Sequence, residues 1–208
     1  MTIRSYLMAT FYDSAMKQAE ARLLYPYRLK LLNTLEGRVL EIGSGTGINI
    51  PFYQNIDRLI CSEPDANMRR HLKKKIEAHD GFPIELLESS AEKIGVEDAS
   101  IDVVVSTLVM CSVKDQAQVL SEIKRVLKPG GKLVFLEHVC SHDKKTEKWQ
   151  ARVTPTWSYL FDNCHLNRLT AKAIEDAGFD IEIEHIQFKQ LFALLSTWIA
   201  GVGRVKAI

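Results

Sequence analysis

Two patterns of hydrophobic residues alternate along most of the chain, one typical of buried strands and one typical of amphipathic helices. Short apolar runs of β-branched and aliphatic residues predict seven strands at residues 39–42, 58–62, 82–87, 101–106, 133–136, 179–185 and 204–207. Between them, apolar residues recur at spacings of three and four, as in Met68, Leu72 and Ile76, which indicates amphipathic helices. Strands that alternate with helices are typical of an α/β fold, and we expect a Rossmann-like, mostly parallel, seven-stranded sheet.

Helices are also predicted before the first strand. Phe11, Ala15, Ala19 and Leu23 recur at helical spacing, and Pro26 then restarts the chain in a second short helix that ends near residue 37. We interpret residues 1–37 as a helical cap over the sheet and residues 1–208 as a single domain. In the cap, Tyr12 and Tyr25 either reach a ligand or pack against the sheet. A second addition is the aromatic and polar segment 139–168, which we expect on the substrate side.

The first strand runs into a glycine-rich turn, V-L-E-I-G-S-G-T-G at residues 39–47. Glycine allows positive φ and lets a ligand approach the backbone, and the helix predicted from residue 48 would direct free N–H groups at it. A dinucleotide fingerprint needs its third glycine one position later than Gly47. Glu41, just before the turn, would repel a pyrophosphate and attract a cation.

The turn therefore favours S-adenosylmethionine, which carries an amino group and a sulfonium and has no phosphate. We expect Glu41, Gly43, Ser44, Gly45 and Gly47 at this cofactor. The alternative is an ordinary strand–turn whose glycines serve geometry alone.

Two further groups of polar residues lie at predicted strand ends. Glu63, with Pro64 beside it, follows the second strand about 20 residues after the first glycine, where this fold class places an acid on ribose hydroxyls. Asp65 is the second candidate for that role, although it is better suited to capping the next helix. Ser106 and Thr107 end the fourth strand, so we expect them beside the methionine part of the cofactor.

The composition limits the function classes. Of 208 residues, 46% are hydrophobic and 25% charged, and the net charge of +1 gives no electrostatic reason to expect nucleic acid as a partner. Four dispersed cysteines without a C-x-x-C pair indicate reduced thiols and a cytoplasmic protein. We expect no signal peptide. We also expect no transmembrane segment, because the apolar run at 192–202 is too short to span a membrane. Peripheral membrane contact stays open.

Several motifs together resemble a known family. L-E-I-G-S-G-T-G at 40–47, D-V-V-V-S-T-L-V at 102–109, R-V-L-K-P-G-G at 125–131 and E-H-V at 137–139 are similar to class I S-adenosylmethionine-dependent methyltransferases of the type 11 group. T-L-V-M-C-S-V at 107–113, F-D-N-C at 161–164 and L-N-R at 166–168 resemble the methyltransferase-like proteins that methylate small alkyl thiols.

This resemblance implies further properties. It implies the class I methyltransferase fold with an antiparallel last strand, S-adenosylmethionine as cofactor, and a small-molecule methyl acceptor. It also implies an adenine contact at Ser90, Ala91 and Glu92, although Ser90 replaces the usual acid. The resembling eukaryotic proteins have an apolar N-terminal membrane segment, which we expect this chain to lack.

A thiol acceptor must lose its proton before it attacks the methyl group. His138 and His165 are the candidate bases because imidazole titrates near neutrality, and Asp162 would orient one of them or act itself. Each histidine is equally compatible with a structural role. We expect no metal site, since His138, Cys140 and His142 have poor spacing for joint ligation, and we expect Cys111 and Cys164 to be packing residues.

Three classes of function follow from these residues. The first is methylation of a small thiol. The second is N-methylation of a phospholipid amine or C-methylation of a quinone, and the third is a nicotinamide-binding or non-catalytic binding protein.

Overall fold

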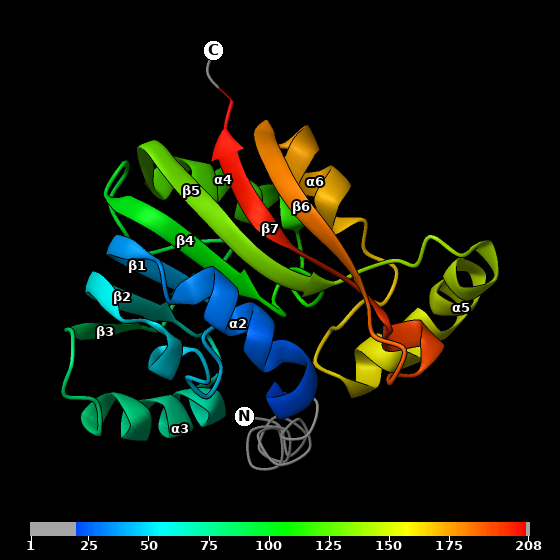
Figure 1. The fold of residues 1–208 in the computed structure, drawn as a ribbon, viewed down its shortest axis with the longest axis horizontal. Helices are drawn as coiled ribbons and strands as arrows, with labels where there is room; N and C mark the ends of the chain where they lie inside the picture. Colours follow the sequence, from blue (N-terminus) through cyan, green and yellow to red (C-terminus); the bar gives the residue numbers. More distant parts are fainter. Residues whose placement is uncertain (1–19, 207–208) are drawn as a thin grey trace.

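A computed structural model describes residues 20–206 and contains one seven-stranded sheet (Figure 1). The strand order is β3-β2-β1-β4-β5-β7-β6. The strands are β1 (Glu36–Ile42), β2 (Asn55–Ser62), β3 (Ile84–Leu87), β4 (Ile101–Thr107), β5 (Leu127–His138), β6 (Phe179–Gln187) and β7 (Thr197–Val205). This arrangement confirms the predicted Rossmann-like fold of the class I methyltransferases.

Strands β1 to β5 are parallel, and β7 is inserted antiparallel between β5 and β6. Ile42 at the end of β1 is level with Ser62 of β2 and Ser106 of β4, while Thr107 is level with Leu136 of β5. The carboxyl ends of four strands therefore meet at one edge of the sheet, where open α/β folds bind their ligands.

The sheet is buried on both faces because its central strands are apolar on both sides. Val39, Val103 and Val105 pack in one cluster with Leu72 of α3 (Ala66–Glu77). Leu40 and Val104 point the other way, into a cluster with residues of α4 (Gln116–Val126) and α6 (Thr170–Asp176). Near-continuous β-branched strands are thus explained by two layers of helices.

Side-chain caps fix the starts of two crossover helices. Asp65 accepts hydrogen bonds from the amides of Asn67 and Met68, both at 2.9 Å, which confirms the predicted cap of α3. Asp115 caps α4 in the same way. Each cap satisfies amides that the first helical turn leaves without intrahelical partners.

Two predicted boundaries were wrong. Residues 48–53 form only the short 3₁₀ helix η2 (Ile50–Phe52), because Tyr53 is already extended and leads into β2. In the cap, α2 (Tyr25–Leu32) ends well before Gly37, which lies in β1 with φ +78°. Pro26 does stand in the first turn of α2, after the π-helical turn η1 (Glu20–Leu24).

The carboxyl-terminal half differs more from the prediction. β5 begins at Leu127, and its register with β4 is interrupted before Lys132, so that Pro129 interrupts the ladder without ending the strand. β7 covers Thr197–Val205, where a short strand was predicted at 204–207. The apolar run at 192–202 is therefore mostly a buried inserted strand.

The helix α5 (Lys144–Leu160) was not predicted either. Pro155 lies inside this helix, where a proline normally argues against helical structure. Among residues 20–206, no helix is both long and apolar enough to cross a membrane.

Candidate functional site

The glycine turn at the end of β1 has the positive φ angles that its sequence predicts. Gly43 and Gly45 both have φ +56°, and Gly47 has φ +79°. A Cβ atom on Gly43 would lie 2.7 Å from Val109, and one on Gly47 would lie 2.7 Å from Leu72. A Cβ on Gly45 would meet no atom of residues 20–206 within 4 Å. Gly45 therefore faces the open side of the turn, where a ligand can lie against the backbone.

Glu63 is tied to this turn by both carboxylate oxygens. Its Oε2 accepts from the amide of Gly45 and its Oε1 from the amide of Asp65, each at 2.8 Å. Burial raises the pKa of Glu63, and the nearby charges of Asp65 and Asp162 raise it further. Each oxygen keeps a second lone pair, so the carboxylate can still accept from ribose hydroxyls. Pro64 beside it is exposed.

A buried polar cluster lies beneath the turn. Tyr53 donates to Glu41 at 2.5 Å, and burial raises the pKa of this fully buried carboxyl to about 7. Arg28 of α2 donates to Asn49 and, at 3.1 Å, to Thr107, while Asn49 also donates to Thr107 at 2.9 Å. Ser44 donates to the carbonyl of Glu41 at 3.1 Å.

Sequence reasoning missed three members of this cluster, namely Arg28, Asn49 and Tyr53. Arg28 is only 2% exposed, yet in the sequence it resembles any cation on a surface helix. Its guanidinium is the charged group here that suits the carboxylate of an amino-acid ligand. The cluster thus supplies a cation and an acid with a raised pKa near the end of β1.

The two residues predicted at the end of β4 have different surroundings. Ser106 is fully buried and donates to Glu137 at 2.7 Å, and Glu137 also accepts from the amide of Val109 at 3.1 Å. Burial raises the pKa of Glu137. Thr107 instead belongs to the cluster beneath the glycine turn. The Ser106 hydroxyl therefore forms its hydrogen bond inside the sheet, whereas the Thr107 side chain lies next to the glycine turn.

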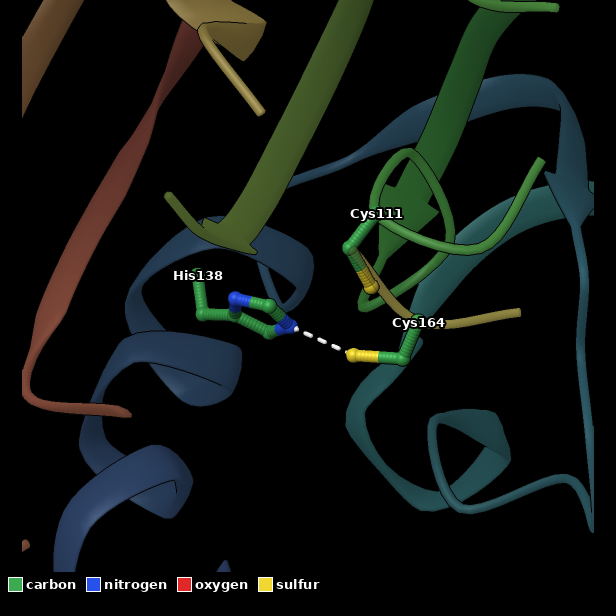
Figure 2. Close-up of side chains that lie close together, drawn as sticks. All are labelled: Cys111, His138 and Cys164. Atoms are coloured by element: carbon green, nitrogen blue, oxygen red, sulfur yellow. Dashed lines mark hydrogen bonds between the residues drawn. The ribbon is translucent and has the colours of Figure 1, made fainter. Parts of the chain in front are cut away.

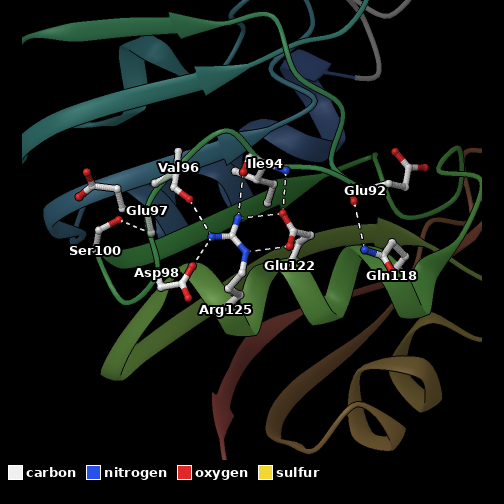
Figure 3. Close-up of polar contacts among 9 residues, drawn as sticks. All are labelled: Glu92, Ile94, Val96, Glu97, Asp98, Ser100, Gln118, Glu122 and Arg125. Atoms are coloured by element: carbon white, nitrogen blue, oxygen red, sulfur yellow. Dashed lines mark hydrogen bonds and ion pairs between the residues drawn. The ribbon is translucent and has the colours of Figure 1, made fainter.

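The loop after β3 contains the predicted adenine residues. Ala91 is buried in the core, Ser90 is half-buried, and Glu92 accepts from the amide of Lys114 at 2.8 Å. Figure 3 shows that the loop is held on α4 by Arg125, which donates to the carbonyls of Ile94 and Val96 at 2.9 and 2.8 Å and pairs with Glu122 and Asp98. Arg125 is a positioning residue that sequence reasoning missed.

The first of the predicted bases, His138, is the last residue of β5. His138 Nε2 lies 3.1 Å from Cys164 Sγ, and Cys111 also points toward this group (Figure 2). Trp198 packs its ring edge-on against the imidazole, with the centroids 5.9 Å apart. The hydrogen bond with Cys111, in which the Cys164 thiol donates, and burial raise the pKa of Cys164 above its ordinary range, which favours the neutral thiol.

The other two predicted catalytic residues have surroundings of their own. Asp162 is exposed with φ +46°, and its charge acts on Glu63. His165 Nε2 lies 3.2 Å from the side chain of Asn163, and burial with the charge of Arg168 lowers the pKa of His165. Within residues 20–206, His138 Nδ1 has no hydrogen-bond partner.

The remaining expectations concern the cap and the cysteines. Tyr12 lies outside the described residues, and Tyr25 is half exposed, with its ring edge-on to Phe52 at 5.2 Å. All four cysteines are free thiols. The Nε2 atom of His142 lies 3.4 Å from the Nδ1 atom of His185. His138 lies close to Cys111 and Cys164 and does not form a group with Cys140 and His142 among the described residues.

Comparisons with known proteins show the family to which the chain belongs. Residues 40–135 match the family described as methyltransferase domain. The chain is 40% identical over 167 residues to thiol S-methyltransferase TMT1A of Homo sapiens, covering 78% of this chain and 68% of that protein. It is 38% identical over 186 residues to thiol S-methyltransferase TMT1B of Rattus norvegicus, covering 86% and 76%.

Among solved structures, Haemonchus contortus phosphoethanolamine N-methyltransferase 2 in complex with S-adenosyl-L-methionine matches 100% of this chain and 60% of its own length. The TM-score is 0.74 and the identity 18%, so this likeness concerns the fold. The sequence relatives are methyltransferases, so they favour this activity over that of a nicotinamide-dependent oxidoreductase. The chain belongs to the family of S-adenosylmethionine-dependent methyltransferases that includes these thiol S-methyltransferases.

Proposed function

We propose that the protein transfers the methyl group of S-adenosylmethionine to the sulfur of a small thiol. The observation that carries this proposal is the 38–40% identity to two thiol S-methyltransferases over most of both chains. The geometry is compatible with it, because the imidazole of His138 stands against a thiol at the carboxyl edge of the sheet.

Residues of this chain that would hold the cofactor lie along the same edge. The backbone of residues 43–47 would contact it on the open side of Gly45, and Glu63 would accept from the ribose hydroxyls. Arg28 would pair with the carboxylate of the methionine part and Glu41 with its amino group. The amide of Ala91 would contact adenine. When bound, the cofactor supplies a methyl group already activated by its sulfonium.

The protein then has to position the acceptor and remove its proton. An in-line displacement needs the sulfur about 3–3.5 Å from the methyl carbon, in a site shielded from water. We infer that His138 is the first candidate for proton removal, since it is buried and already within reach of a thiol. Asp162 and His165 remain candidates because both flank Cys164 in the sequence.

The test is transfer of tritiated methyl from S-adenosylmethionine to a panel of alkyl thiols, a phospholipid amine and a quinone. We expect labelled thioethers, with the rate depending on the pKa of the thiol. Label in the phospholipid or the quinone without label in any thiol would refute the proposal. A cytoplasmic location, peripheral membrane contact and the exclusion of nucleic acid stay predictions from the sequence.

A further inference from the structure

Cys111, His138 and Cys164 form a compact group of three soft ligands. They come from the loop after β4, the end of β5 and the segment after α5, and their ligand atoms all lie within 4.8 Å of one another (Figure 2). Cys111 and His138 are buried and Cys164 is half-buried. The group is therefore closed on the side of the sheet and open on the side of Cys164.

Hydrogen bonds fix the loop of Cys164 to the loop of Cys111. The amide of His165 donates to the carbonyl of Cys111 at 2.8 Å, and Asn163 donates to the carbonyl of Ser112 at 2.7 Å. Arg168 donates to the carbonyl of Val113 at 2.8 Å. Three consecutive carbonyls are thus paired with residues on both sides of Cys164. The two thiols are brought together by hydrogen bonds to backbone carbonyls that do not depend on the thiols themselves.

Resting on the thiol methylation proposed above, we propose that these three residues bind a divalent zinc ion whose fourth position takes the acceptor thiol. Two cysteines and one histidine form a known tetrahedral zinc donor set that keeps one position open. Usual bond lengths place two such sulfurs about 3.8 Å apart and sulfur and nitrogen about 3.6 Å apart. The 3.1 Å between His138 Nε2 and Cys164 Sγ, within the 4.8 Å limit for the group, needs only small shifts to reach these distances.

The location of the site suits methyl transfer. Val109, two residues before Cys111, packs 2.7 Å from the position of a Cβ on Gly43, in the cofactor turn. Its amide also donates to Glu137, which precedes His138. The ligand group is therefore continuous with the turn through residues 109–111 and with the end of β5 through residues 137–138.

The reaction balances with the ion as a Lewis acid. The acceptor thiol binds as a thiolate and releases its proton to water, because a metal lowers the pKa of a bound thiol. A lone pair of the thiolate forms the new carbon–sulfur bond, and the pair of the breaking bond returns to the sulfonium sulfur. The thioether product is a weaker ligand and leaves. In this arrangement the Nε2 atom of His138 is a metal ligand and cannot accept the proton, so the zinc ion replaces His138 in the role of base given to it above.

The experiment measures metal content and affinity directly. Protein purified with zinc and a phosphine reductant is analysed by plasma mass spectrometry, and the metal-free protein is titrated with Co²⁺ in the absence of cofactor. We expect about one equivalent of zinc and a thiolate-to-cobalt charge-transfer band. Cys111→Ser, His138→Gln and Cys164→Ser should each weaken metal binding by more than about 100-fold, since outer-shell changes alone cost about 10–100-fold.

Cys140→Ser is the matched control, because Cys140 is also buried next to the end of β5 but lies outside the group. It should keep the metal, and all variants should keep affinity for S-adenosylhomocysteine if they are folded. No zinc and no charge-transfer band in a protein that methylates thiols would overturn the metal site and leave the proposed function standing. One zinc lost in the three variants, with no thiol methylated, would support the site and refute the function instead.

Discussion

Gly43 and Gly45 offer a matched test of how the cofactor turn works. Both residues have φ +56°, so an alanine at either position carries the same left-handed strain, about 1–2 kcal/mol. They differ in what the new Cβ meets. At Gly43 it lies 2.7 Å from the stiff side chain of Val109, and at Gly45 it meets nothing within 4 Å in the described part of the chain.

The expected effects on stability follow from this difference. Gly45→Ala should lower the free energy of unfolding by about 1–2 kcal/mol, through strain alone. Gly43→Ala adds overpacking of about 1–3 kcal/mol and should cost about 2–5 kcal/mol in all. Urea unfolding of the two variants measures both values. Equal losses in the two variants would refute the argument from packing.

The effect on cofactor affinity should run the other way for Gly45. Gly45→Ala should weaken binding of S-adenosylhomocysteine by at least about tenfold, or 1.4 kcal/mol, because the methyl group enters the space that the ligand occupies. Gly45→Val should weaken it further while circular dichroism stays that of the folded protein. Calorimetric titration decides the matter. Wild-type affinity in both Gly45 variants would mean that the cofactor does not lie against this backbone.

Three other predictions follow from the acids and bases of the site. Glu63→Ala should weaken cofactor binding by about 1.5–3 kcal/mol, the value of a hydrogen bond to a charged group, and unchanged calorimetric affinity would remove Glu63 from the ribose site. The pKa of Glu41 is raised from 4.5 to about 7, so its stabilising contribution is fully present below pH 4.5 and is lost as the pH rises to about 7. Urea unfolding across this pH range should show a loss of roughly 3 kcal/mol in the free energy of unfolding. The Glu41→Gln variant should not show this loss. If Asp162 or His165 removes the thiol proton, its alanine variant should lower kcat by about 10²–10⁴ with cofactor affinity unchanged, and wild-type rates across pH would exclude that residue.

The parts of the fold that the sequence predicted well depend on local rules. Glycine is favoured wherever φ is positive, and Gly43, Gly45 and Gly47 all have a positive φ. Asp65 precedes a helical pattern at capping distance and does cap α3. The β-branched run at 101–106 is buried on both faces, as its composition indicates. In each case the determining contacts lie within a few residues of one another.

The errors arise where tertiary contacts override local preference. No helix was predicted at 144–160, but α5 forms there and continues through Pro155, and its buried Gln150 donates to the distant carbonyl of Leu194 at 2.9 Å. Gly201 and Gly203 weaken the strand pattern of β7, yet Gly201 is required there. A Cβ on Gly201 would lie 2.2 Å from the carbonyl oxygen of Glu182 on the neighbouring strand β6. The close packing of neighbouring strands, which a short stretch of sequence does not reveal, requires glycine at position 201.

The ligand group of the acceptor side shows most clearly where local reasoning stops. The end of β5, which carries His138, and the loop after β4, which carries Cys111, meet at one edge because the two strands are parallel neighbours. The proximity of His138 and Cys111 could therefore be predicted from the order of the strands in the sequence. Cys164 is different, because its position depends on the whole of α5 and on hydrogen bonds from later residues to the carbonyls of residues 111–113. From the sequence alone Cys164 is interpreted as a packing residue, and only those long-range contacts place its thiol beside the imidazole of His138.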